Sequence, residues 1–193
     1  MLWWLKARRA LIVLPVALAV YLLYVLASRD TFVALPSLVG GSNVVLSSFA
    51  PVPVVAGLAV VLSARLPAAE VSGTRRVARW DTALVTAVVL TAVVLGLLLV
   101  PLTGATQAAA AGRNTAFLTG LFLCARTVTG PRGVLVPVAW LMAVVLLGFR
   151  ASGDPYPWTV VPEPPGAPHA ALGAAVLFLA GIATLPRMSR KLS

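Results

Sequence analysis

Long apolar stretches dominate the sequence and most strongly limit its fold. A helix needs about 20 mostly apolar residues to cross the roughly 30 Å hydrocarbon core of a bilayer, because each residue rises about 1.5 Å. Six stretches approach this length, and they occupy residues 10–27, 43–64, 82–102, 105–127, 134–149 and 170–185. None of them alternates apolar and polar residues with a period of two, so the pattern predicts helices and not a transmembrane barrel.

The composition agrees with a chain that lies mostly in lipid. Hydrophobic residues make up 60% of the 193 residues and charged residues only 10%. A soluble domain carries about 25% charged residues, so a soluble globule is excluded. We therefore expect an all-α integral membrane protein with six transmembrane helices, organised as a single transmembrane domain over residues 1–193.

The distribution of basic residues predicts the orientation. With both termini in the cytoplasm, three of the 15 Lys and Arg residues, Arg29, Arg113 and Arg150, lie outside and the other twelve lie inside. This asymmetry is typical of membrane proteins. A cytoplasmic loop over residues 65–81 and an external Pro-rich loop over residues 150–169 follow. Because Arg far outnumbers Lys in a chain rich in Ala, Val, Leu and Gly, we expect a multi-pass protein of a bacterial cytoplasmic (inner) membrane.

The first stretch has one alternative interpretation. A basic leader precedes it, and its end, Val25-Leu26-Ala27, resembles a signal-peptide cleavage site. Its apolar run exceeds the about 7–15 residues of a typical signal-peptide core. A retained helix is therefore favoured over a cleaved signal peptide.

Scarce residue types limit the chemistry. Cys124 is the single cysteine and His169 the single histidine, so an internal disulfide, a Cys-rich metal site and a multi-His metal centre are excluded. No P-loop sequence is present, and no stretch carries Asp or Glu at mid-depth, as ion-coupled transporters usually require. No set of nucleophile, base and acid can be assembled, so we expect no catalytic residue. The net charge of +10 is assigned to membrane topology and not to nucleic acid binding.

Arg113 and Asn114 are the most informative polar residues within the apolar stretches. If the fourth helix begins near residue 105, Arg113 lies inside the outer leaflet, where an arginine is costly unless it is paired, hydrated or able to reach the interface. It would then line a translocation path and pair with an external acid, which would be Asp30, Asp154 or Glu163. If the helix begins at Arg113, that side chain is an interfacial anchor. The sequence leaves both interpretations open.

Two prolines, Pro51 and Pro53, fall inside the second stretch. A proline within a helix removes a hydrogen bond and kinks the helix, so we expect a kink here. The kink would serve either as a gate on the translocation path or as a packing device, and packing is favoured.

The cytoplasmic loop carries an acid followed by a basic cluster. Pro67 and Glu70 suit the first turn of a short helix, and Arg75, Arg76 and Arg79 follow as a basic cluster spaced three or four residues apart. Such an element would dock a cytoplasmic partner. The alternative is a polybasic loop that contacts lipid and fixes the topology.

Three segments resemble the small six-span permeases of ABC-2 type exporters, particularly the actinobacterial type. Residues 69–76 (AEVSGTRR) resemble the E-x-x-G-T element of this family, and residues 113–121 (RNTAFLTGL) resemble the start of its fourth span. The Pro-rich segment around Tyr156-Pro157-Trp158 resembles the external region before its last span. Residues 1–9 depart from the family, because they are shorter than its amphipathic N-terminal helix.

The resemblance implies a permease subunit that couples ATP hydrolysis to the export of an amphiphilic or lipid-like substrate. A separate P-loop ATPase subunit would bind ATP and Mg, and a second permease subunit would complete a homodimer or a heterodimer. The implied coupling residues are Glu70, Gly73, Thr74, Arg75, Arg76 and Arg79. The expected residues of the translocation path are Arg113, Asn114, Pro51 and Pro53. The alternative function is a non-transporting membrane scaffold, accessory or self-protection protein.

Overall fold

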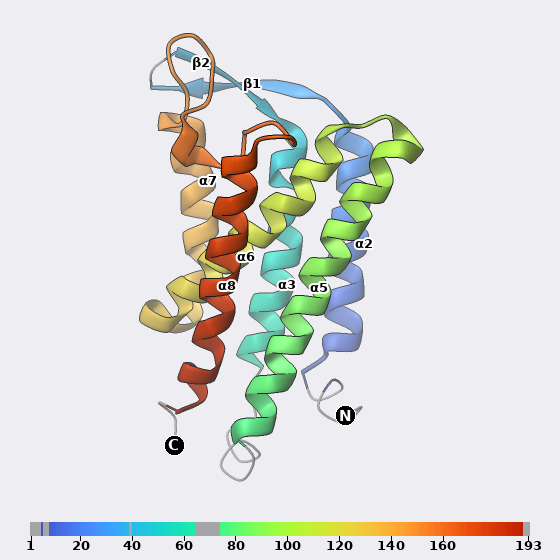
Figure 1. The fold of residues 1–193 in the computed structure, drawn as a ribbon, viewed down its shortest axis with the longest axis vertical. Helices are drawn as coiled ribbons and strands as arrows, with labels where there is room; N and C mark the ends of the chain where they lie inside the picture. The colour runs from blue at the N-terminus through green and yellow to red at the C-terminus, as the bar shows by residue number, and fades with distance from the viewer. Residues whose placement is uncertain (1–4, 6–7, 39, 65–73, 191–193) are drawn as a thin grey trace.

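The protein is a helical bundle capped at one end by a β-hairpin (Figure 1). The computed structural model describes Leu5 and residues 8–38, 40–64 and 74–190. The helices are α2 (Ala10–Ser28), α3 (Pro51–Ser63), α5 (Thr74–Thr103), α6 (Gln107–Thr129), α7 (Leu135–Leu147) and α8 (Pro168–Arg190). The strands are β1 (Phe32–Ser37) and β2 (Gly40–Val45), and the short 3₁₀ helices are η1 (Leu46–Phe49), η2 (Gly130–Val134) and η3 (Pro157–Thr159).

Five helical stretches of the described chain are long and apolar enough to cross a membrane. They are Ala10–Ser28, Leu46–Ser63, Arg79–Thr103, Gln107–Leu147 and Pro168–Pro186. The chain is therefore mostly helical, and its candidate spans suit a multi-pass membrane protein.

The fourth of these stretches contains both α6 and α7. Gly130 has a φ of 63° and ends α6, and α7 then returns toward the hairpin (Figure 1). With 13 residues, α7 is about 20 Å long, which is less than the hydrocarbon core. Six spans therefore stay a prediction.

The second helix begins later than the hydropathy pattern predicts. Residues 43–50, expected inside the second span, form the end of β2, η1 and a turn, and α3 begins at Pro51. A proline in the first turn of a helix removes no hydrogen bond, because the first N–H groups have no partner within the helix. The kink predicted at Pro51 and Pro53 is therefore wrong, since Pro51 starts α3 and Pro53 lies in its first turn.

The hairpin defines one end of the bundle. β1 and β2 pair antiparallel, with Phe32 opposite Val45 and Ser37 opposite Gly40, and lie across the tops of the helices (Figure 1). We name this the hairpin end. At the opposite end α2 and α5 begin and α8 ends, and we name it the basic end.

Helix α6 lies at the centre of the bundle, between α5 and α8. Glycines bring these helices together: a Cβ on Gly120 would lie 2.5 Å from the carbonyl oxygen of Leu177 in α8. A Cβ on Gly96 of α5 would lie 2.5 Å from the carbonyl oxygen of Ala108 in α6. Since lipid supplies no hydrophobic drive between helices, such close backbone packing is a main source of their association.

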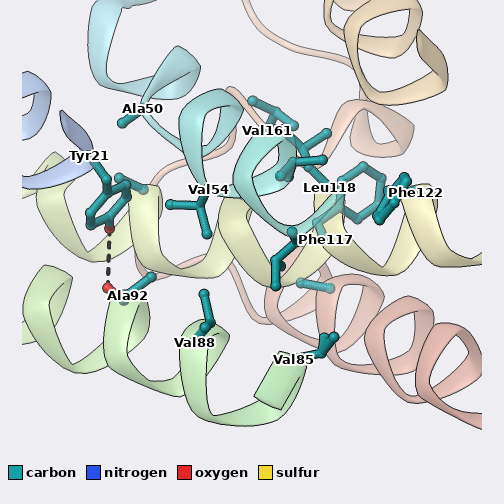
Figure 2. Close-up of a cluster of buried hydrophobic side chains, with 14 of the residues drawn as sticks. Tyr21, Ala50, Val54, Val85, Val88, Ala92, Phe117, Leu118, Phe122 and Val161 are labelled. Carbon is teal, nitrogen blue, oxygen red and sulfur yellow. Dashed lines mark hydrogen bonds between the residues drawn. The ribbon is translucent and has the colours of Figure 1, made fainter. Parts of the chain in front are cut away.

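Tyr21 anchors α2 in the hydrophobic core. Its side chain is fully buried, and its hydroxyl donates a hydrogen bond of 3.1 Å to the carbonyl oxygen of Ala92 in α5 (Figure 2). Val54 of α3 and Leu118 of α6 lie in the same core. This integration favours a retained first helix over a cleaved signal peptide.

Candidate functional site

Helix α5 carries the basic cluster that was predicted to couple to a partner. Its 30 residues span about 45 Å, which exceeds the thickness of the hydrocarbon core. The apolar candidate span starts only at Arg79, so Thr74, Arg75 and Arg76 precede it in the same helix. Arg79 is exposed. The cluster is therefore joined to the core of the bundle by unbroken helix.

This arrangement differs from the loop expected over residues 65–81. Residues 74–81 belong to α5, because Arg75, Arg76, Ala78 and Arg79 favour helix and extend the following span by two turns. The other two predicted coupling residues, Glu70 and Gly73, lie outside the described residues.

A buried ion pair lies at the basic end of α5. Nη1 of Arg8 is 2.6 Å from Oδ1 of Asp81, and the two side chains are 4% and 3% exposed. A buried charge is tolerated when a counter-charge neutralises it. Sequence reasoning counted both residues only as topology signals. The available signal was a pair of opposite charges, each lying next to the start of a long apolar stretch.

Arg126 joins α6 to the end of α3 at the same side of the bundle. Its Nη2 donates a hydrogen bond of 2.7 Å to the carbonyl oxygen of Leu62, in the last turn of α3. Its guanidinium carbon also lies 5.9 Å from the centre of the Phe122 ring. Since the last carbonyls of a helix have no partner within it, Arg126 caps α3 with a positive charge.

At the hairpin end, the side chain of Arg113 forms hydrogen bonds with the segment that follows η3. Its Nη1 donates a hydrogen bond of 2.9 Å to the carbonyl oxygen of Pro164. Its Nη2 donates to the carbonyl oxygens of Val160, at 2.9 Å, and Glu163, at 2.7 Å. One charged side chain thus satisfies several main-chain acceptors of a loop that has little regular structure of its own.

Asn114 binds the same segment from inside the bundle. It is 1% exposed, and its Nδ2 donates a hydrogen bond of 2.9 Å to the carbonyl oxygen of Val161. Its Oδ1 accepts a hydrogen bond of 3.2 Å from Nε of Arg113, which fixes the orientation of the guanidinium. We name Arg113 and Asn114 together the clamp.

The start of α6 tests one part of the two interpretations of Arg113. Helix α6 begins at Gln107, so the prediction of a helix that starts at Arg113 is wrong. The hydrogen bonds that Arg113 donates to the loop go to main-chain carbonyls, including that of Glu163. Asp30 instead accepts from the N–H of Gln107 at 3.1 Å, and Asp154 accepts from the hydroxyl of Ser152 at 2.8 Å. Of the three acids expected from the sequence, Glu163 attracts Arg113 electrostatically, whereas the main-chain acceptors were not expected.

An apolar groove opens between α3 and α7, with Leu118 of α6 among its lining residues. The other lining residues are Val52, Val55, Ala56, Val134, Pro137 and Val138. Within the part of the chain that the structure describes, Pro51, Pro53, Arg113 and Asn114 do not line this groove. The prediction of a translocation path lined by these four residues therefore stays a prediction.

Acidic, histidine and cysteine side chains do not cluster in the described ranges. No group of three or more of them comes close enough to hold a metal ion there. His169 lies at the start of α8, with Nε2 3.5 Å from the carboxylate of Glu163. Cys124 is a partly buried free thiol of α6.

The two charged regions, at the basic end and at the clamp, are thus the candidate functional sites. No protein-family model, no curated protein and no solved structure matches this chain.

Proposed function

We propose that the protein is the transmembrane permease subunit of an ABC exporter. A separate P-loop ATPase subunit would bind ATP and Mg and hydrolyse the nucleotide. The observation that carries this proposal is the continuity of α5, which runs from Thr74 and the basic residues Arg75, Arg76 and Arg79 into the centre of the bundle. A partner that binds those residues holds one end of a rigid element.

The contact between α5 and α6 supports transmission of force through this element. A Cβ on Gly112 of α6 would lie 2.9 Å from Cα of Val93, so the two backbones touch near the middle of α5. Closely packed interiors shift as units because they do not deform continuously. A displacement of the first turns of α5 therefore moves α6, and α6 carries the clamp directly after Gly112, at the hairpin end.

In this proposal the chain crosses the membrane six times, with α7 as a short fifth crossing. The basic end, with both termini, faces the cytoplasm of a bacterium, and the hairpin end faces outward. A second permease chain, identical or related, lies beside the first.

The substrate is amphiphilic or lipid-like, since few charges lie within the spans. Arg113, Asn114, Pro51 and Pro53 all lie toward the hairpin end and would border the exit of a path between the two chains.

A non-transporting membrane scaffold or self-protection protein is the second candidate. It is favoured by the close glycine contacts of α6 with both α5 and α8, which suit a rigid bundle. It is also favoured by the wholly apolar lining of the groove between α3 and α7. Neither feature requires a nucleotide-binding partner.

The decisive experiment is purification of the tagged protein from its host into nanodiscs, with mass spectrometry of the proteins that co-elute. We expect a P-loop ATPase with the unmodified protein. We expect its loss in a variant that combines Glu70→Arg with Arg75→Glu. Arg132→Glu is the matched control, because Arg132 is an exposed arginine of η2 outside the coupling segment. Recovery of an intact bundle without any ATPase would reject the exporter and favour the scaffold.

A further inference from the structure

The backbone at Val160 adopts a strained conformation. Val160 has φ 53° and ψ −50°, and the N–H of Val161 donates a hydrogen bond of 2.5 Å to the carbonyl oxygen of Thr159. These values describe a γ-turn of the rare positive-φ form. A β-branched residue is strongly disfavoured at positive φ, because its side chain crowds the main chain. The turn therefore persists only where its surroundings hold it.

The clamp holds this turn from the side of α6. Arg113 bonds to the carbonyl oxygen of Val160, and Asn114 bonds to that of Val161, so both carbonyls that follow the strained φ are fixed. On the side of α8, a Cβ added to Gly173 would lie 3.5 Å from Cγ2 of Val160, and Nε2 of His169 lies 3.5 Å from the carboxylate of Glu163. Val160 itself is buried.

Two further contacts attach the same segment to α7. Trp158 packs edge-to-face on Trp140, with ring centres 5.7 Å apart. The N–H of Tyr156 donates a hydrogen bond of 2.9 Å to the carbonyl oxygen of Gly148, at the end of α7. Residues 156–164 thus lie over the hairpin end and touch α6, α7 and α8. We name them the lid.

We propose that the lid is a strained element that Arg113 and Asn114 latch closed. A movement of α6 that pulls the clamp away from the carbonyls of Val160 and Val161 releases the γ-turn, and the relaxation of Val160 favours the open lid. The lid is therefore a two-state element whose closed state depends on the position of α6. This inference is separate from the proposed function, because it rests only on contacts within this chain.

Hydrogen exchange measured by mass spectrometry in nanodiscs tests the latch. We expect Arg113→Gln to accelerate exchange in a peptide covering residues 156–167 by about ten-fold or more, since hydrogen bonds from a charged donor are lost. Peptides from residues 117–127 of α6 should exchange at the unmodified rate, which shows that the bundle is intact. Arg132→Gln is the control for the loss of one positive charge. Unchanged exchange of the lid in Arg113→Gln would overturn the latch.

Two substitutions at Val160 test the strain independently of the clamp. Val160→Ala and Val160→Gly both remove the branched side chain, but only glycine adopts positive φ without cost. With correction for intrinsic exchange rates, the lid should exchange about five-fold or more slowly in Val160→Gly than in Val160→Ala. Equal exchange, or faster exchange in Val160→Gly, would show that the turn stores no strain and would overturn the proposal.

Discussion

The guanidinium of Arg8 lies 2.6 Å from the carboxylate of Asp81, and both side chains are buried at the basic end. Arg8 precedes α2 and Asp81 lies in the third turn of α5, so this ion pair fixes the start of the first helix against the helix that carries the basic cluster. A buried pair of this kind makes each residue costly to remove alone.

The first prediction concerns that pair. Asp81→Leu should destabilise the bundle by about 3–5 kcal/mol, because Arg8 loses a buried counter-charge. Arg8→Met combined with Asp81→Leu should recover most of the loss. Unfolding in mixed micelles of the single and double variants measures the coupling. Equal instability of the two would show that the ion pair is not the source of the effect.

The second prediction uses two glycines of α8. A Cβ on Gly181 would lie 2.8 Å from the carbonyl oxygen of Gly120, whereas a Cβ on Gly173 would meet nothing closer than 3.5 Å. Gly181→Ala should therefore cost about 1–3 kcal/mol through overpacking. Gly173→Ala should be neutral or slightly stabilising, since alanine favours helix by about 1 kcal/mol. The apparent melting temperatures of the two variants in detergent distinguish them, and equal values would contradict the close contact.

The hydropathy pattern predicted helix positions well where a single apolar stretch lies within a single helix. The predicted span over residues 82–102 ends one residue before α5 does, at Thr103. It failed at residues 43–45, which belong to β2, because Val44 and Val45 raise the hydropathy equally in a strand and in a helix. The useful signal was local: a proline at position 51 suits a helix start.

The clamp residues could be found from the sequence, but the groups that they bind could not. Charge and position singled out Arg113 and Asn114, because an arginine within an apolar stretch requires compensation. The compensation comes from backbone carbonyls of Val160, Glu163 and Pro164, and every residue type has a carbonyl, so no sequence pattern marks these acceptors. Acidic residues such as Asp154 can be identified in a sequence and were therefore expected as partners, but Asp154 accepts a hydrogen bond from Ser152 instead.

The third prediction compares two threonines of α6. Thr115 donates a hydrogen bond of 2.9 Å to the carbonyl oxygen of Ala111. Thr119 is fully buried, and among the residues that the structure describes its hydroxyl has no hydrogen-bond partner. Thr119→Val should be neutral or stabilising, while Thr115→Val should cost about 1 kcal/mol, since valine preserves the shape of threonine and removes only the hydroxyl. Thermal unfolding in detergent checks the order, and a larger loss at Thr119 would reveal a partner for its hydroxyl.

The fourth prediction decides whether α7 crosses the membrane. Thr129 ends α6 at the basic end, and Ser152 lies beyond α7 at the hairpin end; both are exposed. If α7 is a crossing, a cysteine at one position reacts with a membrane-impermeant maleimide on intact cells and a cysteine at the other does not. In a Cys124→Ser background, Ser152→Cys should label from outside, and Thr129→Cys should label only after permeabilisation, because the proposed orientation and the positive-inside rule assign the turn with Arg126 and Arg132 to the cytoplasm. Labelling of both from outside would instead make α6 and α7 a re-entrant pair, which leaves four spans, α2, α3, α5 and α8, and keeps the two termini on the same side of the membrane.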